Sequence, residues 1–303
     1  MTLYDLPAPA KLNLFLHVVG RRADGYHLLE SLFRLVSLSD TLTIDLRADG
    51  KISRESSIAA VVAEADDLVV RAAQALQNAT GTRQGAHIAV HKRIPVGGGL
   101  GGGSSDAATV LMALNRLWRT GLTRAELMAL ALPLGADVPF FLLGQSAFVT
   151  GIGERCTPVA LPETAYVVFK PKESVSTALV FGSPHLTRDT ETVKMSDFSG
   201  RRWFLGNSPF GANDLEPVVL QAFPSIALTR EWLIDQGYDV RLTGSGACFF
   251  SEFGGPLQAL LAYEGLQAKL KTFVSGTSEH DVLQSAFVCD GLPSHPLQHW
   301  LVN

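Results

Sequence analysis

The stretch from Gly97 to Ser105 has a composition that suits the binding of an anion. It reads Gly-Gly-Gly-Leu-Gly-Gly-Gly-Ser-Ser, with six glycines in its first seven positions. So many glycines are costly to order, and a ligand or the close approach of another backbone has to account for them. Such a loop offers bare amide N–H groups and two hydroxyls in one place, which is typical of a phosphate site.

The residues around this loop indicate a strand before it and a helix after it. Residues 87–94 alternate apolar and polar, and Pro95 then ends the strand. Ser104 or Ser105 suits the N-cap of a helix that we expect to run to about Arg119. The positive end of that helix would then face the loop.

Other glycine loops fit the stretch less well. A P-loop requires Lys where this chain has Gly103. The dinucleotide fingerprint fits Gly97, Gly99 and Gly102, but no acid-terminated strand follows about 20 residues later. A protein-kinase loop would be followed by its own lysine strand and catalytic loop, which are missing. A glycine-rich surface linker is the remaining alternative, and the capped helix makes it less favoured.

Two charged side chains occur in otherwise apolar surroundings. Lys11 opens the alternating pattern Leu12 to Val18, and Asn13 falls on the same face of that expected strand. Asp137 lies in the turn 134–139, directly before an apolar run. A lysine there is often a solvated strand end, and the aspartate can serve as the N-cap of a short helix. Each residue alone therefore leaves the structural alternative open.

Two further turns bear groups that can recognise a ligand. Residues 22–27 place Tyr26 and His27 side by side after an Asp-Gly pair, which is also what a plain hairpin would show. Residues 242–248 contain Gly244, Ser245 and Gly246, a second possible backbone cradle or an ordinary tight turn.

The pattern of the remaining chain predicts alternating helices and strands. Expected strands are 28–36, 40–46, 147–150, 166–169, 240–243 and 247–251; expected helices start near Asp67, Thr123, Ser225 and Pro256. This arrangement indicates an α+β protein, with a domain boundary just after Pro158.

Composition restricts the class of protein. The chain has 303 residues and a formal net charge of −4, without a basic tract, so a nucleic-acid partner is not expected. No apolar run approaches 18 residues and the start lacks a signal-peptide pattern, so we expect a cytoplasmic protein with no membrane partner. Cys156, Cys248 and Cys289 are few and widely spaced, and we interpret them as small buried residues.

The order strand, proline, glycine loop, Ser-Ser and helix resembles the ATP loop of the GHMP small-molecule kinases. Two more segments carry the resemblance: Pro-Ala-Lys-Leu-Asn at 9–13 and Leu-Gly-Ala-Asp-Val-Pro at 134–139. Within the superfamily they are similar to members that phosphorylate a cytidine diphosphate-linked alcohol. The resemblance implies a two-domain α+β fold, with an N-terminal ATP-binding α/β domain over 1–158. A C-terminal ferredoxin-like α/β sandwich would span 159–303 and complete the substrate site.

The resemblance also implies roles for residues. Lys11 and Asp137 would be the catalytic pair, and the acceptor would be a small molecule. Nucleotide contacts would come from Pro95, Val96, Gly97, Gly98, Gly99, Leu100, Gly101, Gly102, Gly103, Ser104 and Ser105. Substrate contacts would come from Asn13, Tyr26, His27, Thr177, Phe181, Gly244, Ser245 and Gly246. Mg²⁺ is expected with ATP, although the sequence marks no carboxylate as its ligand. The family often has Asn-Leu near the adenine where this chain has Asp67 and Leu68. Asp67 lacks the amide donor of the asparagine, which disfavours a nucleotide contact at Asp67 itself.

Three rival functions stay open. The least favoured is a redox enzyme that uses the glycine loop for a dinucleotide, and a test for bound nicotinamide absorbance would exclude it. The same fold could phosphorylate homoserine, mevalonate or a sugar, which would be favoured if Tyr26, His27 and Phe181 lay away from the cleft. A regulator that binds nucleotide without turnover would be favoured if Lys11 and Asp137 lay too far apart to meet one hydroxyl.

Overall fold

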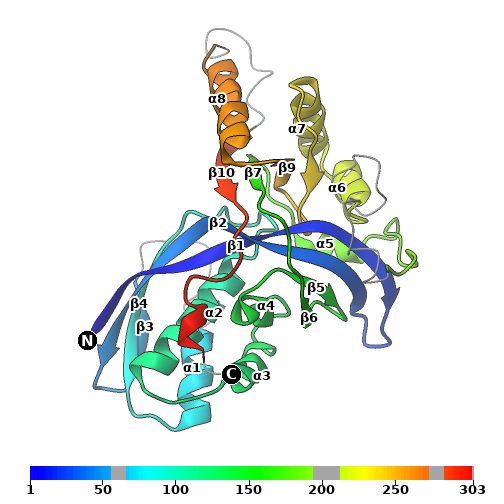
Figure 1. Cartoon of the computed structure of the whole chain (residues 1–303). Helices are drawn as coiled ribbons and strands as arrows, with labels where there is room; N and C mark the ends of the chain where they lie inside the picture. Colours follow the sequence, from blue (N-terminus) through cyan, green and yellow to red (C-terminus); the bar gives the residue numbers. More distant parts are fainter. Residues whose placement is uncertain (56–65, 194–211, 273–282, 302–303) are drawn as a thin grey trace.

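Two long antiparallel strands run through the middle of the molecule. The computed structural model describes residues 1–55, 66–193, 212–272 and 283–301. Strands β1 (Thr2–Arg21) and β2 (His27–Arg47) pair with each other along most of their length. Figure 1 shows the helices of the N-terminal half on one side of this ribbon and a second sheet on the other. The ribbon therefore contributes residues to both halves of the protein.

The first sheet has the order β3-β4-β2-β5-β6, and β1 also pairs with β2. The other elements of this half are β3 (Ile52–Arg54), α1 (Leu68–Thr80), β4 (Gly85–His91), α2 (Gly102–Leu117), α3 (Arg124–Ala131), α4 (Val138–Leu143), β5 (Ala147–Thr150) and β6 (Arg155–Pro158). Apolar residues of the four helices pack against this sheet and form one continuous core. The core holds α2, and with it the glycine loop, in a fixed position.

Several local predictions are confirmed. The Asp67 side chain accepts a hydrogen bond from the amide of Val69 and caps α1, which ends at Gly81 in the left-handed conformation. Thr123 and Glu126 form the expected capping box of α3. These signals were reliable because each depends only on residues next to the helix end.

The prediction of two strands at 28–36 and 40–46 is wrong, because β2 is continuous. The polar residues between them suggested a break. In the fold, Asp40 is fully buried, and its carboxylate accepts hydrogen bonds from the amides of Arg93 and Ile94. The same two bonds draw residues 92–94 out of the predicted strand, so that β4 ends at His91.

The expected ends of helix α2 were also wrong. Its N-cap is Gly101, with φ of 73°, and not Ser104 or Ser105. A glycine accepts this left-handed conformation without steric cost, so the helix can begin three or four residues earlier. It ends at Leu117, and Arg119 has φ of 55° instead of a helical value.

The second sheet has the order β10-β7-β9-β8, with antiparallel neighbours throughout. Its elements are β7 (Ala165–Pro171), α5 (Thr177–Gly182), α6 (Glu216–Ala222), α7 (Pro224–Asp235), β8 (Arg241–Leu242), β9 (Phe249–Phe253), α8 (Pro256–Thr272) and β10 (Leu283–Asp290). The succession of strand, helices, two strands, helix and strand is the ferredoxin-like arrangement. The expected α+β class is confirmed.

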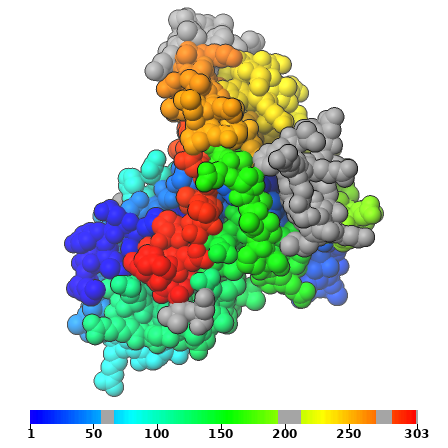
Figure 2. Space-filling model, viewed as in Figure 1, coloured from blue at the N-terminus to red at the C-terminus, as the bar shows by residue number. Residues whose placement is uncertain are grey.

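The end of the described chain returns to the first half. After β10, the amide of Leu292 donates to Leu35 O and the amide of His295 donates to Gly144 O. Leu297 and Leu301 then join the core beneath the first sheet. Figure 2 shows this segment, in red, lying on the surface formed by the N-terminal half.

Within the described ranges, no helix is both long enough and apolar enough to cross a lipid bilayer.

Candidate active site

The glycine loop is packed against the second glycine turn. The amides of Ala247 and Cys248 donate to Gly97 O and Gly98 O, at 3.1 Å and 3.2 Å. A Cβ at Gly99 would lie 2.2 Å from Thr243 O, and one at Gly244 would lie 2.9 Å from Gly99 O. The close approach of two backbones therefore explains part of the glycine run, and the two predicted cradles form one structure.

On the other side of this loop, the first amides of α2 have no hydrogen-bond partner among the residues that the structure describes. Gly101 has no side chain that could cap the helix, and the amides of Gly102, Gly103 and Ser104 precede the first intrahelical bond. Residues 95–103 line a cavity of about 300 Å³, together with Asp67, Leu68 and Lys92, whereas Ser104 and Ser105 are not among its lining residues. The Ser105 hydroxyl is buried and donates to Pro9 O, so it faces away from this cavity.

A buried cluster of three charges lies under the same cavity. The Lys92 ammonium donates to a carboxylate oxygen of Asp40 and, at 2.7 Å, to Oδ2 of Asp106. The two carboxylates outweigh burial and raise the pKa of Lys92. Burial, opposed by Lys92 and reinforced by Asp40, raises the pKa of Asp106 to about 7. This cluster, Asp40, Lys92 and Asp106, ties β2, the start of the loop and α2 together.

Lys11 and Asp137 lie together although 126 positions separate them in the sequence. Lys11 Nζ is 3.6 Å from Asp137 Oδ2, donates to Asn13 Oδ1 at 2.5 Å and stands 4.7 Å from the centre of the Phe33 ring. Burial lowers the pKa of Lys11, and Asp137 partly offsets this effect. Asp137 occupies the N-cap position of α4, but its carboxylate makes no capping hydrogen bond. The carboxylate is therefore available for chemistry.

A larger cavity of about 680 Å³ opens next to this pair. Lys11, Asp137, Gly99 and Gly101 line it, and the two glycines also line the smaller cavity. The two cavities therefore meet at the glycine loop, beside Lys11 and Asp137.

The predicted substrate residues come together around the larger cavity, with one exception. It is lined by Asn13, Tyr26, His27, Thr177, Phe181, Gly244 and Ser245. Gly246 is not among its lining residues, and its amide donates to Thr243 O inside the turn.

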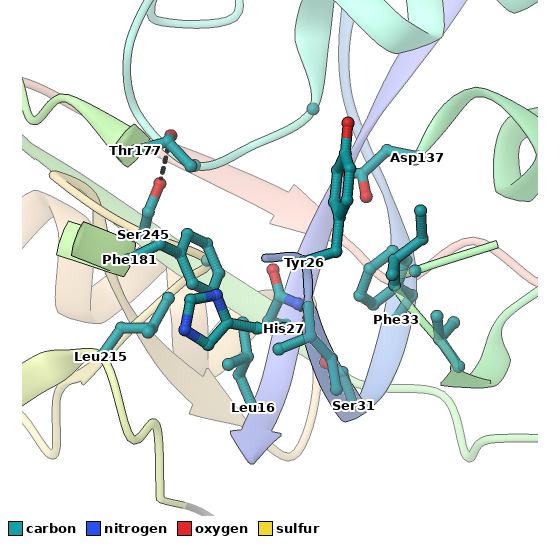
Figure 3. Close-up of a pocket in the computed structure, with 18 of the residues that line it drawn as sticks. Leu16, Tyr26, His27, Ser31, Phe33, Asp137, Thr177, Phe181, Leu215 and Ser245 are labelled. Carbon is teal, nitrogen blue, oxygen red and sulfur yellow. Dashed lines mark hydrogen bonds between the residues drawn. The ribbon is translucent and has the colours of Figure 1, made fainter. Parts of the chain in front are cut away.

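The aromatic groups define one end of the larger cavity. The His27 and Phe181 rings lie 5.1 Å apart, and Tyr26 is 60% exposed. In Figure 3, Tyr26 stands between this pair and Asp137. A flat ring could therefore enter among apolar and aromatic surfaces here.

Hydrogen bonds fix the wall next to Phe181, which lies on α5 together with Thr177. Thr177 Oγ1 and Ser245 Oγ are 2.7 Å apart, the contact dashed in Figure 3. The Asn213 side chain donates to Leu242 O and Gly244 O and so holds the glycine turn.

Several residues that line the two cavities were not predicted from the sequence. The alternation that begins at His27 continues through Leu29, Ser31 and Phe33, all of which line the larger cavity. The same period on β4 would have found Ile88, Val90 and Lys92 in the smaller one. Arg54, Glu55 and Asp106 gave no comparable signal, because tertiary packing brings them there.

Two of the three cysteines are buried as expected, and Cys156 is not. Cys248 and Cys289 are buried and Cys156 is half-buried, and burial raises the pKa of each thiol to about 12. A thiol of this kind is a poor nucleophile at neutral pH. Across the described parts of the chain, no three His, Cys, Asp or Glu side chains gather in a way that could hold a metal ion.

Comparison with known proteins agrees with this geometry. Residues 67–145 match the GHMP kinases N terminal domain, and residues 202–272 match the GHMP kinases C terminal. A 4-diphosphocytidyl-2-C-methyl-D-erythritol kinase of Bordetella parapertussis is 57% identical over 304 residues, which cover 100% of both chains.

Solved structures that are similar to this chain are also kinases. A crystal structure of a 4-(cytidine 5′-diphospho)-2C-methyl-D-erythritol kinase has a TM-score of 0.76 at 36% identity, covering 96% of this chain and 100% of that one. A homoserine kinase from Cytophaga hutchinsonii has a TM-score of 0.67 at 15% identity over 97% of this chain and 95% of its own, and shares the fold. The protein belongs to the GHMP kinases and, within them, to the family of 4-diphosphocytidyl-2-C-methyl-D-erythritol kinases.

Proposed function

We propose that this kinase transfers the γ-phosphoryl group of ATP to the 2-hydroxyl of 4-diphosphocytidyl-2-C-methyl-D-erythritol. The observation that carries the proposal is the Lys11–Asp137 pair, 3.6 Å apart, where the larger cavity meets the glycine loop. The names of the full-length relatives support the choice of acceptor. The reaction serves the supply of isoprenoid precursors in the cytoplasm.

Asp137 acts as the proton acceptor. Its side chain is 30% exposed and faces the larger cavity, where an acceptor hydroxyl can reach it. A phosphoryl transfer of loose character requires the proton to leave only as the new O–P bond forms. The carboxylate can take that proton at this moment without ionising the alcohol beforehand.

Lys11 stabilises negative charge at the same point. At 3.6 Å, its attraction for the Asp137 carboxylate is about 4 kcal/mol before desolvation is subtracted. Because Asn13 holds its ammonium from one side, Lys11 stays directed toward Asp137 and the incoming phosphoryl group. The ammonium thus offsets negative charge that develops during transfer.

The glycine loop and the start of α2 bind the triphosphate. Unpaired amides at the positive end of a 16-residue helix favour such an anion. Mg²⁺ would be held mainly by oxygens of the triphosphate, with the Ser104 hydroxyl in the first turn of α2 as a protein oxygen, and it would neutralise phosphate charge. The nucleoside would enter the smaller cavity between the loop and α1.

The acceptor's cytosine would occupy the aromatic end of the larger cavity. Tyr26, His27 and Phe181 all line it, which favours a flat base over homoserine or mevalonate. The short Lys11–Asp137 distance argues against a regulator without turnover.

The test is ADP release by purified protein with 4-diphosphocytidyl-methylerythritol, homoserine, mevalonate or no acceptor. We expect turnover with the cytidylyl acceptor alone. Comparable turnover with another acceptor would refute the substrate assignment, and nucleotide binding without turnover on any of them would favour the regulator.

A further inference from the structure

We infer that Arg188 is a positioning residue of the base pocket. It fixes His27 in the neutral tautomer that carries its proton on Nδ1, so that the imidazole offers the bound base a hydrogen-bond donor. The inference deepens the proposed function and rests on it for the identity of the base. The Nδ1–H group of His27 requires a hydrogen-bond acceptor on the edge of the bound base, such as O2 or N3 of cytosine.

The hydrogen bond between the two side chains determines the tautomer. Arg188 Nε lies 3.0 Å from His27 Nε2. A guanidinium only donates, so Nε2 has to accept with its lone pair. A neutral imidazole that is unprotonated on Nε2 carries its hydrogen on Nδ1.

The guanidinium is itself held in place by main-chain carbonyls. Its Nη1 donates to Leu186 O at 2.9 Å, and its Nη2 donates to Phe181 O at 3.2 Å and Ser183 O at 2.7 Å. Arg188 therefore connects the end of α5 with the first residue of β2. The His27–Phe181 ring contact at 5.1 Å depends on both segments.

The surrounding charge keeps the imidazole neutral. Burial, Arg188 and Arg21 all lower the pKa of His27. A second proton on Nε2 would face the Arg188 guanidinium directly, so the imidazolium is excluded by the same contact.

The Nδ1–H group remains for a ligand. Across the described residues, the only hydrogen bond of the His27 ring is the one from Arg188. His27 lines the larger cavity, so the donor can meet an acceptor atom of a bound base. The other tautomer would present a lone pair there, which repels O2 or N3 of cytosine and removes one hydrogen bond.

The first test is ¹⁵N NMR of the histidine rings in the unmodified, full-length protein, with His27 assigned by comparison with His27→Gln. We expect a protonated Nδ1 and an unprotonated Nε2 at pH 7, before any ligand is added. A protonated Nε2, or a doubly protonated ring, would overturn the inference. This measurement does not depend on turnover. The inference about the His27 tautomer can therefore fail while the proposed acceptor stays correct, and the reverse also holds.

Variants connect the tautomer with binding, and cytidine 5′-diphosphate serves as the probe. Arg188→Met removes every donor and keeps an unbranched side chain. We expect it to shift the His27 ring toward the Nε2–H tautomer and to weaken cytidine diphosphate binding about tenfold or more. Arg188→Lys keeps one donor and should recover part of both effects. An unchanged tautomer and affinity in Arg188→Met would contradict the inference.

A matched pair at His27 covers the case in which the Arg188 variants fail to fold. The amide nitrogen of His27→Asn falls near the former Nδ1, whereas that of His27→Gln falls near the former Nε2. Both lose the ring contact with Phe181 equally. We expect His27→Asn to bind cytidine diphosphate more tightly than His27→Gln, and the reverse order would refute a donor at Nδ1.

Discussion

Lys11 keeps an ammonium group where few lysines are found, since its side chain is only 5% exposed. The Asp137 carboxylate, the Asn13 amide oxygen and the face of the Phe33 ring share its stabilisation. Even so, burial dominates and the pKa of Lys11 is lowered. The site therefore holds a positive charge whose burial is unfavourable and is only partly compensated by its neighbours.

Replacing this lysine should separate activity from stability. Lys11→Met retains the apolar stem and removes the buried charge, while the partly exposed Asp137 can be solvated by water. Because folding depresses the lysine pKa, the charge costs folding free energy at neutral pH. We expect kcat to fall at least 100-fold, while the free energy of unfolding stays the same or rises by about 1 kcal/mol. Urea unfolding and steady-state kinetics measure the two quantities. A strongly destabilised variant would mean that the lysine is structural.

Elements that lie far apart in the sequence create the loop's shape. Gly99 has φ of 74° and meets the Thr243 carbonyl, so its conformation depends on both the loop and the second glycine turn. The charge cluster of Asp40, Lys92 and Asp106 fixes the other side of the loop. The elements hold the loop in place before any ligand arrives.

Gly99→Ala tests this contact. The new methyl group would clash with a main-chain carbonyl in a backbone conformation that alanine rarely adopts. We expect a loss of about 2–4 kcal/mol in unfolding free energy and weaker binding of ATP. Gly265→Ala is the control, because nothing lies within 4 Å of that position in α8. It should stabilise the protein by about 1 kcal/mol. Equal effects in calorimetry would contradict the packing described here.

The charge cluster should give stability a distinct pH dependence. Because the pKa of Asp106 rises to about 7 on folding, the folded protein takes up a proton between about pH 4 and 7 that the unfolded chain releases. Asp106 therefore contributes stability at low pH that is lost as pH rises through this window, at most about 4 kcal/mol.

Asp106→Asn should remove that slope, and denaturant unfolding from pH 4 to 7.5 measures it. The exposed Asp235→Asn at the end of α7 controls for the loss of a carboxylate. If the free energy of unfolding of Asp106→Asn and of the wild type varied with pH in parallel, Asp106 would not take up a proton on folding.

The two halves of the molecule are connected by segments that contribute residues to both. Strands β1 and β2 contribute to both cores, and residues 291–301 return to the first. The larger cavity therefore has walls from both halves, whereas all residues that line the smaller cavity belong to the first half. The division at 158 stays a prediction about domains.

Leu297→Ala tests the contribution of the returning segment. Leu297 is 6% exposed and packs with the core of the first half, so its truncation should cost about 2–5 kcal/mol. Leu257→Ala on α8, at a position 69% exposed, should change stability by less than about 0.5 kcal/mol. Thermal unfolding compares them, and a neutral Leu297→Ala would show that this segment is not part of the core.

The features that could be predicted from the sequence were mainly those with a short-range signal. The caps at Asp67 and Thr123 were predictable because neighbouring residues determine them. The glycine loop was recognisable by its composition, and the class of the fold by the succession of helix and strand patterns. The continuity of β2 was not, since a distant loop satisfies Asp40. The charge cluster and the role of Arg188 likewise depend on contacts between segments that no local pattern reveals.

The position of the transferred phosphate tests the central proposal most directly. Product formed by the wild type from ATP and 4-diphosphocytidyl-methylerythritol would be examined by proton-coupled ³¹P NMR, beside Asp137→Asn. Carbon 2 carries a methyl group and no hydrogen, so a 2-phosphate should give a new signal without the three-bond proton splitting that phosphates on carbons 1 or 3 would show. We expect this signal from the wild type and a rate reduced about 10²- to 10⁴-fold in Asp137→Asn. A split signal, or full activity in the variant, would contradict the proposed chemistry.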